Sequence, residues 1–534
     1  MIKNLPFTFY SLFLIFSCFF YIPLCAQQIQ WQKTLGGKQG DYLYEALPTP
    51  DYGFILAGSS VSEISGIKTE ENRGNLDYFL WKMNEQGQEE WQKSLGGNQA
   101  DFLYSIGLTR DGGYILGGSS YSGISGDKKD SCRGQDDYWI IKLNAAGQEE
   151  WQKTIGGSGS DHLLSIQQTS DGGYILGGSS DSPVSYEKTD PSKGSMDFWI
   201  IKLDAKGKIL WQKTLGGLYY DLLGSIKEIP EGYILAGTSH SPKSEDKSED
   251  NLGKGDYWLL KLDKNGKLLW EKTLGGKKNE ELHDMIVASD GGYILAGSSD
   301  SPQEGMKISP QDKGLDFWIV KTDKNGTILW QQSIDIGTQD IVSKIVENKD
   351  NSFSVAGSSL EITPEGETES NYILVRLSSK GEILAKQKIG GDKKDILQTA
   401  VDTRDGTLLM AGTSNSGKSG NKTVENTGQT DFWLVKLYEE NNDYIPQNSL
   451  HKRKNTEVYP NPTERFVNVI IYEELTGNEN IEIYDISGKL LQQKTVKYST
   501  TPIDLAGYPP AIYILSISLP SGKKESIKII KTGK

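Results

Sequence analysis

Short apolar runs, rich in β-branched and aromatic residues, recur along most of the chain and are separated by Gly- and Asp-containing turns. In one unit the run 114–120 (Tyr-Ile-Leu-Gly-Gly-Ser-Ser) is followed by a polar loop and then by the run 137–143 (Asp-Tyr-Trp-Ile-Ile-Lys-Leu). Runs of this length between turn signals are typical of β-strands rather than helices. Each unit holds four such runs, so the pattern predicts four short strands per unit in an all-β protein.

This unit is repeated seven times. Six repeats open with a Trp-Gln-Lys-Thr-Leu-Gly-Gly-like run, and a seventh opens with Ala-Lys-Gln-Lys-Ile-Gly-Gly. The repeats start at Trp31, Trp91, Trp151, Trp211, Trp270, Trp330 and Ala385. Subtracting successive positions gives steps of 60, 60, 60, 59, 60 and 55 residues. A near-constant period of this size indicates a repeat architecture in which neighbouring units share a core.

Four strands per repeat and seven repeats predict a seven-bladed β-propeller over residues 27–437. A β-helix has shorter coils, and separate domains of about sixty residues without disulfides have too little core, so both alternatives are less favoured. The strand at Trp31 precedes the first complete blade, whereas the last repeat ends at 432–436 without a Trp-Gln-Lys strand. We therefore expect the N-terminal strand to complete the seventh blade.

Eleven of the twelve tryptophans occupy only two repeat positions. Six of them open the repeats, and the other five are Trp139, Trp199, Trp258, Trp318 and Trp433. A ligand-stacking aromatic residue is expected in one or a few blades, whereas a packing residue recurs in all of them. We therefore predict that these tryptophans form the core between blades.

Composition and charge narrow the choice of partners. The 534 residues include 60 Gly, 26 Tyr and 12 Trp, which suits strands and tight turns. The formal net charge of −14 argues against nucleic acid and anionic membranes as partners, because both require a basic surface. The stretch 262–270 resembles one hairpin of quinoprotein-type propeller repeats, but the chain has no adjacent Cys pair and no haem-attachment motif. We therefore expect no cofactor.

Residues 1–26 have the layout of a secretory signal peptide. Lys3 precedes a long apolar stretch, and the small residue Ala26 stands directly before the polar Gln27. We expect cleavage between Ala26 and Gln27, which leaves no transmembrane anchor; the alternative is that the apolar stretch is kept as an anchor. Cleavage also removes two of the three cysteines, so Cys132 remains alone and no intrachain disulfide forms.

An acidic residue recurs ten positions after the start of every repeat, just before the strand expected to line the central channel. This first set is Asp41, Asp101, Asp161, Asp221, Glu280, Asp340 and Asp395. A second set precedes the third strand of the repeats and comprises Asp77, Asp137, Asp197, Asp256, Asp316 and Asp431. We interpret both sets as turn residues that accept backbone N–H bonds. The alternative is that the first set converges at one mouth of the channel and binds a cation or a ligand.

Residues for catalysis are sparse. His162, His240 and His283 lie at different repeat positions, which argues against a His-based metal site or a catalytic triad. Cys132 lies in a polar loop without a neighbouring His, so we do not expect it to act as a nucleophile. A glycosidase-like pair of carboxylates stays open, because acids are plentiful, but no pair is singled out by its spacing. We therefore assign no catalytic residue and no metal ligand.

The C-terminal part of the chain, after a polar linker at 438–456, has motifs that the repeats lack. Residues 458–462 read Val-Tyr-Pro-Asn-Pro, 481–491 read Ile-Glu-Ile-Tyr-Asp-Ile-Ser-Gly-Lys-Leu-Leu, and 512–515 read Ile-Tyr-Ile-Leu. In this order they resemble the C-terminal sorting domain of the type IX secretion system, a small β-sandwich found on exported proteins of Bacteroidetes. The residues that carry the resemblance are Tyr459, Pro460, Asn461, Pro462, Gly488, Lys489 and Tyr513.

The resemblance covers residues 457–534 and has consequences for location. It implies recognition by the type IX secretion machinery, passage through the outer membrane, removal of the domain, and either release or attachment at the cell surface. The sequence departs from the family pattern at Ala511, where the family usually has Gly.

Two functions remain in competition, with a purely structural surface protein as a third. The first is a secreted or cell-surface propeller that binds a glycan or protein ligand through the long loops between the second and third strands. Loops such as 61–76 and 121–136 differ between blades while the frame stays constant, which favours this binding role. The alternative is an exported polysaccharide-acting enzyme that uses the acids at the channel mouth.

Overall fold

The protein is built from strands and turns. The computed structural model describes residues 27–309, 314–362, 368–438, 455–463 and 465–532. No helix occurs among these residues, so the all-β prediction is confirmed, and none of them forms a helix able to span a membrane. The predicted signal peptide, including Ala26, and residues 439–454 of the predicted linker lie outside the described residues.

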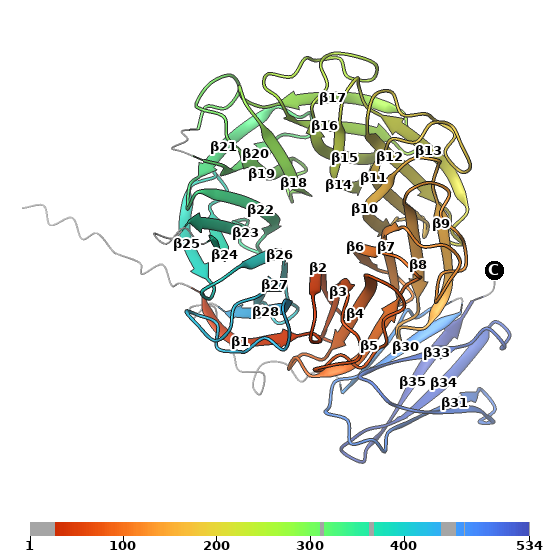
Figure 1. Cartoon of the computed structure of the whole chain (residues 1–534). Coiled ribbons are helices and arrows are strands. Elements are labelled where there is room, and N and C mark those ends of the chain that lie inside the picture. The colour runs from red at the N-terminus through yellow and green to blue at the C-terminus, as the bar shows by residue number, and fades with distance from the viewer. Residues whose placement is uncertain (1–26, 310–313, 363–367, 439–454, 464, 533–534) are drawn as a thin grey trace, which may run out of the picture.

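Seven four-stranded antiparallel sheets stand in a ring around a central channel (Figure 1). The innermost strands are β2 (Asp41–Pro48), β6 (Asp101–Leu108), β10 (Asp161–Gln168), β14 (Asp221–Ile229), β18 (Glu280–Val287), β22 (Gln339–Glu347) and β26 (Asp395–Asp402). The second strands are β3 (Phe54–Ser60), β7 (Tyr114–Ser120), β11 (Tyr174–Ser180), β15 (Gly232–Ser239), β19 (Tyr293–Ser299), β23 (Phe353–Ile362) and β27 (Leu408–Ser414). The third strands are β4 (Asp77–Met83), β8 (Asp137–Leu143), β12 (Asp197–Leu203), β16 (Asp256–Asp263), β20 (Asp316–Thr322), β24 (Thr368–Leu377) and β28 (Asp431–Tyr438). The outermost strands are β5 (Glu89–Leu95), β9 (Glu149–Ile155), β13 (Ile209–Leu215), β17 (Leu268–Leu274), β21 (Ile328–Ile334), β25 (Ile383–Ile389) and β1 (Gln28–Leu35).

The ring is closed. Each innermost strand contacts the innermost strands of both neighbouring sheets, and the contact between β2 and β26 joins the first sheet to the last. This is the arrangement of a β-propeller. We number the sheets as blades 1 to 7 in chain order of their innermost strands, from β2 to β26.

The N-terminal strand completes blade 7, as predicted from the sequence. β1 pairs antiparallel with β28, with Trp31 opposite Lys436 and Leu35 opposite Phe432. The order of the closing sheet is β1-β28-β27-β26, so its outer strand comes from the start of the chain and its other strands come from the end of the repeats. This pairing leaves no unpaired edge on β28 between the first and the last blade.

The tryptophans of the third strands fill the spaces between blades. Trp139, Trp199, Trp258, Trp318 and Trp433 are all 0% exposed, which confirms the packing prediction for this set. Tyr138 of blade 2 lies against Trp199 of blade 3, with 4.9 Å between ring centroids, and its hydroxyl donates to the Trp199 carbonyl oxygen. Four of the five tryptophans have such a Tyr partner, whose hydroxyl is satisfied, and Trp258 packs against Phe198 instead; each contact buries a large area and holds neighbouring blades together.

The loops between the second and third strands share one backbone form in five blades. In those blades a Ser and a Lys three residues later form a short antiparallel bridge, for example Ser125 with Lys128. Lys128 is buried, donates to the Thr154 hydroxyl, and lies 5.1 Å from the centre of the Trp139 ring. The sequences of these loops differ between blades, but a buried Lys anchors them. The shared anchor fixes the backbone of these loops, although their sequences differ between blades.

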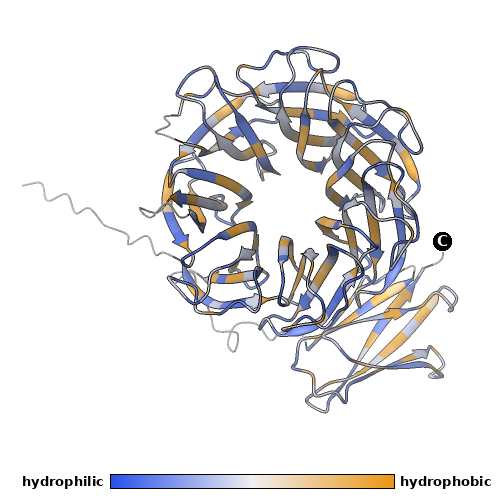
Figure 2. Cartoon of the chain, in the orientation of Figure 1, coloured by the Kyte–Doolittle hydropathy of each residue, from blue (hydrophilic) through white to orange (hydrophobic). Residues whose placement is uncertain are grey.

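The C-terminal domain is a β-sandwich, as predicted. One sheet is formed by β29 (Thr456–Tyr459), β30 (Phe466–Ile471) and β33 (Thr500–Asp504). The other is formed by β32 (Leu490–Thr495), β31 (Asn480–Asp485), β34 (Ala511–Ser518) and β35 (Lys524–Lys531). Val469, Ile483 and Leu515 belong to one buried apolar cluster within this domain. Apolar residues, orange in Figure 2, concentrate in the strands of both domains, and the C-terminal domain lies beside blade 1 of the ring (Figures 1 and 2).

Candidate functional site

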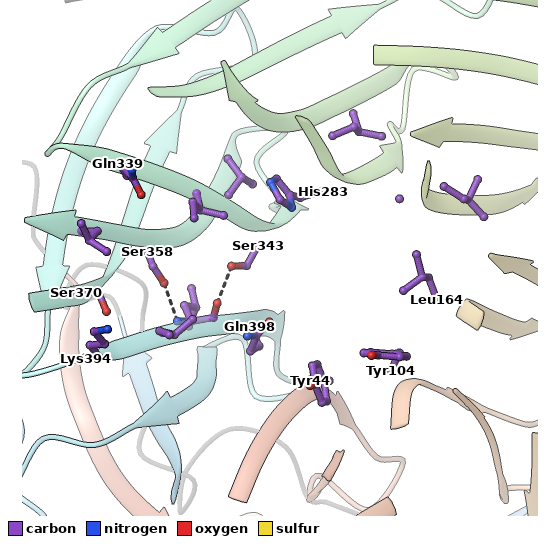
Figure 3. Close-up of a pocket in the computed structure, with 18 residues that line it drawn as sticks. Tyr44, Tyr104, Leu164, His283, Gln339, Ser343, Ser358, Ser370, Lys394 and Gln398 are labelled. Atoms are coloured by element: carbon purple, nitrogen blue, oxygen red, sulfur yellow. Dashed lines mark hydrogen bonds between the residues drawn. The ribbon is translucent and has the colours of Figure 1, made fainter. Parts of the chain in front are cut away.

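Every innermost strand contains a β-bulge at the same place. Its pairing with the second strand shifts by one residue, so one residue has no partner on the neighbouring strand. The seven bulge residues are Tyr44, Tyr104, Leu164, Gly224, His283, Ser343 and Gln398. All of them line the central channel, and the side chains labelled in Figure 3 come from several blades around it. We call this set the bulge ring.

The bulge ring varies while its frame stays constant. The residue before each bulge is a buried Leu in six blades and Val342 in the other. At the bulge itself the seven blades contribute two Tyr, one Leu, one Gly, one His, one Ser and one Gln. A bulge re-aims a side chain without disturbing the rest of the sheet. The ring therefore places six residue types at seven equivalent positions around one channel.

A cavity of about 610 Å³ lies on the side of the ring where the innermost strands begin. Apolar side chains form most of its wall beside the ring, namely Leu223, Leu282, Ile341, Val342, Leu360, Ile396 and Leu397. Tyr44 and Tyr104 meet edge to face, with 5.0 Å between ring centroids. Burial raises the pKa of both hydroxyls above the ordinary value, so these hydroxyls stay protonated. This half of the channel offers aromatic and aliphatic surface with few charges.

A second cavity of about 500 Å³ shares the ring and extends towards the ends of the innermost strands. Here Lys344 lies between two carboxylates, 3.7 Å from Glu45 and 3.8 Å from Asp284. Glu45 also accepts the Ile106 backbone N–H, and Asp284 accepts that of Ile345. The carboxylates of Asp284 and Glu45 raise the pKa of Lys344. These charged groups therefore join neighbouring blades and keep this half of the channel polar.

Several donors in this second cavity have no hydrogen-bond partner among the described residues. They are the Nε2 atoms of Gln167 and His283 and the hydroxyl of Thr399. Lys227 lines the same cavity, and burial together with the nearby Lys344 lowers its pKa. Burial also lowers the pKa of His283, so its ring is neutral at pH 7. The three atoms are themselves buried, so they are not exposed at the surface of the cavity.

The recurrent acids of the first set do not face an open channel mouth. Asp41, Asp101, Asp161, Asp221, Glu280, Asp340 and Asp395 are all 0% exposed. Each accepts the backbone N–H of the residue four positions earlier, at 2.6–2.7 Å. At Asp161, for example, the donors are the Gly157 N–H and the Ser182 hydroxyl. The carboxylates point into their own turns because these donors need an acceptor there, which matches the interpretation as turn residues.

Five members of the second acid set pack against the first glycine of the same turns, and in the turn beside Asp316 this position is Asp335. A Cβ atom on Gly156 would lie 2.0 Å from Oδ1 of Asp137, so only glycine fits there. In blade 6 the equivalent residue is Asn371, and a Cβ atom on Gly390 would lie 1.9 Å from its Oδ1. Burial, with a smaller effect of Asp161, raises the pKa of Asp137 to about 7. The neutral amide of Asn371 in blade 6 thus occupies the position that the carboxyl group of Asp137, with its raised pKa, occupies in blade 2.

Other candidate groups are separate from the channel ring. Among the described residues, the acids whose oxygens come close enough to share a cation are Asp316, Asp335 and Asp340, within 4.8 Å of one another. Burial raises the pKa of Cys132 to about 11, which keeps the thiol protonated. Nε2 of His162 lies 3.1 Å from the carboxylate of the buried Asp136, whose hydrogen bond raises the pKa of His162.

The motif residues of the C-terminal domain hold its strands and turns. Asn461 donates to the Lys528 carbonyl oxygen and accepts the Ile530 N–H, so the Pro-Asn-Pro segment, Pro460 to Pro462, is tied to β35. Gly488, at φ 84°, forms the turn between β31 and β32, and Lys489 donates its N–H to the Asp485 carboxylate in the same turn. Tyr513 is buried and donates to the Pro509 carbonyl oxygen. Tyr459 is the last residue of β29.

Gln27, which follows the predicted cleavage position, lies on the propeller. Its backbone oxygen accepts a hydrogen bond from the Gln387 side chain on blade 6.

Comparison with known proteins decides the nature of this domain. Residues 457–532 match the family model of the secretion system C-terminal sorting domain. The C-terminal domain is a type IX secretion sorting domain. The sorting domain marks the protein for export to the cell surface or the medium. The matched residues include all the motifs that indicated this domain in the sequence.

Similarity outside the sorting domain is distant. The regulatory protein FlaEY of Caulobacter vibrioides is 25% identical over 185 residues, which cover 33% of this chain and 19% of that protein. PorZ of Porphyromonas gingivalis, a bacterial surface component of the type IX secretion system, has 13% identity and a TM-score of 0.40 over 95% of this chain and 61% of that one. The hydrazine synthase of Kuenenia stuttgartiensis has 10% identity and a TM-score of 0.38 over 69% and 92% of the two chains. No function is transferred from these likenesses.

Proposed function

We propose that the protein is a ligand-binding β-propeller, exported by the type IX secretion system after removal of the signal peptide 1–26, and that a glycan binds in its central channel at the bulge ring. The sorting domain supports export and delivery to the surface or the medium. The bulge ring carries the proposal for the ligand site. Its seven channel-lining positions differ in residue type between blades, whereas the residues around them are nearly the same in every blade.

The chemistry of the channel suits a saccharide. A sugar ring presents C–H faces that pack on aromatic rings, and Tyr44 and Tyr104 supply such a surface. Its hydroxyl groups both donate and accept, and the ring offers His283, Ser343 and Gln398 for these bonds. Pockets that combine apolar walls with a few convergent polar groups are typical ligand sites. From the sequence alone we expected the ligand to bind at the long loops between the second and third strands. We now propose that it binds in the channel.

The enzyme alternative depended on exposed acids at the channel mouth. The seven acids of the first set are fully buried in their turns. In the channel itself, Glu45 and Asp284 both hold Lys344 and backbone N–H groups, as described above. We therefore propose binding rather than catalysis.

The test is a glycan array followed by titration calorimetry with the best ligand. Tyr104→Ala is expected to lower the affinity at least about tenfold, or about 1.4 kcal/mol, because it removes one wall of the ring. Tyr219→Ala, at an exposed tyrosine between β13 and β14, is the matched control and is expected to bind as the native protein does. The proposal fails if the array gives no ligand, or if the best ligand binds Tyr104→Ala with unchanged affinity.

A further inference from the structure

The sorting domain makes specific contacts with the hairpin turns of blades 1 and 2. The Ser499 N–H donates to Glu90 of blade 1 at 3.1 Å, and the Thr500 hydroxyl donates to Asp51 of the same blade at 2.8 Å. Asn468 donates to the backbone oxygen of Asp111 in blade 2 at 2.5 Å. The contacts lie where the domain meets the ring in Figure 1. The two bonds to blade 1 use charged acceptors, and such hydrogen bonds are stronger than neutral ones.

The turn of blade 1 differs from the equivalent turns at the residue that meets the sorting domain. Four other blades have glycine there with φ between 80° and 85°, namely Gly112, Gly172, Gly291 and Gly406. Blade 1 has Tyr52, at φ 68°. A non-glycine residue is strained in this left-handed conformation, because its Cβ atom comes close to the following carbonyl oxygen. The Tyr52 ring lies edge to face with Tyr472 of the sorting domain, at 5.5 Å between centroids.

The sorting domain covers an ion cluster whose aspartate is more than half exposed in blades 3, 5 and 6. Lys82 lies 2.9 Å from Asp51 and 2.8 Å from Glu90. The side chain of Asp51 is 1% exposed, whereas the equivalent Asp171, Asp290 and Asp350 are 57%, 59% and 56% exposed. Asp405 of blade 7, which lies next to blade 1, is also buried, at 9% exposed. Burying this cluster would be costly without further hydrogen bonds. The hydroxyls of Ser499 and Thr500 supply them, since both donate to Asp51.

Two further residues fit the same surface. A Cβ atom on Gly112 would lie 2.1 Å from Nδ2 of Asn468 and 3.1 Å from the hydroxyl oxygen of Tyr459, so the glycine that this turn shares with other blades also leaves room for the sorting domain. Arg404 of blade 7 donates to the Pro50 carbonyl oxygen at 2.6 Å and lies 5.8 Å from the centre of the Tyr52 ring. The surface thus spans blades 7, 1 and 2, across the point where the ring closes.

We propose that the turn 49–53 of blade 1 is a docking site for the protein's own sorting domain, and that the propeller holds this domain as a noncovalent partner. The strained Tyr52 and the covered Asp51 are both explained by this docking, and the glycine at 112 leaves room for it. The tyrosine of the Tyr-Pro-Asn-Pro motif lies at the interface, so machinery that reads Tyr459 meets it only after the two domains separate. This inference rests on the domain contacts and is independent of the proposed glycan site.

The docking is tested in the full chain with a protease site introduced in the linker, within 439–454. After cleavage at about 10 µM, the two fragments of the otherwise native protein are expected to elute together in size-exclusion chromatography. Tyr52→Gly restores the glycine of the other blades, so the propeller keeps its fold, but it is expected to weaken the association of the fragments about tenfold. Asn351→Gly is the matched control, because Asn351 has the same backbone conformation in blade 6, at φ 61°, away from the sorting domain.

A second variant alters only the sorting domain. Ser499→Ala with Thr500→Val removes both hydroxyl donors and is expected to separate the fragments as Tyr52→Gly does, while Ser521→Ala, at an exposed turn of that domain, leaves them together. The inference is overturned if the native fragments separate on cleavage. It is equally overturned if Tyr52→Gly and the Ser499–Thr500 double variant both co-elute with native affinity.

Discussion

Replacing Asp137 with Asn is expected to stabilise the protein above pH 7 and to change its stability little at pH 4. The carboxyl group is 0% exposed, and its pKa of about 7 compares with an ordinary value of 3.8. Between these two values the folded protein binds one proton more at this group than the unfolded chain does. The free energy of unfolding therefore falls as the pH rises through this window and stays low above it. An amide does not titrate, so the variant avoids this loss.

The magnitude follows from the two pKa values. One pKa unit corresponds to about 1.4 kcal/mol, so the raised value of Asp137 corresponds to at most about 4 kcal/mol at high pH. Relaxation of the turn and entry of water reduce this, and we expect a gain of about 2–4 kcal/mol for Asp137→Asn at pH 8.5. Blade 6 shows that the site accepts an amide, because Asn371 occupies the equivalent place against Gly390.

Urea denaturation at pH 4 and pH 8.5 measures the effect for three proteins: native, Asp137→Asn and Asn371→Asp. Asn371→Asp introduces a buried carboxyl group at the equivalent position of blade 6, so its free energy of unfolding should be lower than that of the native protein at pH 8.5. The reasoning is refuted if Asp137→Asn shifts the free energy of unfolding equally at both pH values. It is also refuted if Asn371→Asp is as stable as the native protein at pH 8.5.

Three other predictions concern closure, export and the acids. Deleting 27–37 should lower the melting temperature by several degrees or more, because blade 7 loses β1; an unchanged melting curve in calorimetry would contradict the closure. A chain truncated after Thr456 should remain in the periplasm, and fractionation that finds it at the surface as efficiently as the full chain would exclude the sorting role. Asp161→Asn should cost about 1–2 kcal/mol through its weakened turn, and a chelator should leave the native melting temperature unchanged. A calcium-dependent shift of several degrees would instead favour cation binding.

The features that the sequence predicted are those that repeat. The Trp spacing indicated the ring of sheets, and recurrence marked Trp199 and its equivalents as packing residues, because identical contacts between blades demand identical side chains. The missing outer strand of the last repeat indicated the role of β1. The motifs at 458–462 and 481–491 indicated the sorting domain by their order.

The features that the sequence did not predict are those that differ from the repeat. A β-bulge leaves no mark of its own in the residue pattern, so His283 looked misplaced among the histidines although it shares its position with Tyr44 and Gln398. The sequence did contain an indication of the bulge ring. The position three residues after the recurrent acid differs between repeats, whereas the acid itself is nearly the same in all of them. Tyr52 likewise departs from a Gly-containing turn, but its partner Tyr472 lies in another domain, and a contact of such long range has no local sequence pattern.

The pairing of β1 with β28 also sets the order in which the chain can fold. Gln28 and Tyr438, which meet in this sheet, are 410 positions apart. β1 is therefore among the first strands to be made and the last to find its partner, and contacts of such high sequence separation form slowly. Until then β28 has an open edge that invites pairing with other chains. A chain that stalls or is cut before β28 has no closed state to reach, so completion of the ring reports that the whole propeller has been synthesised.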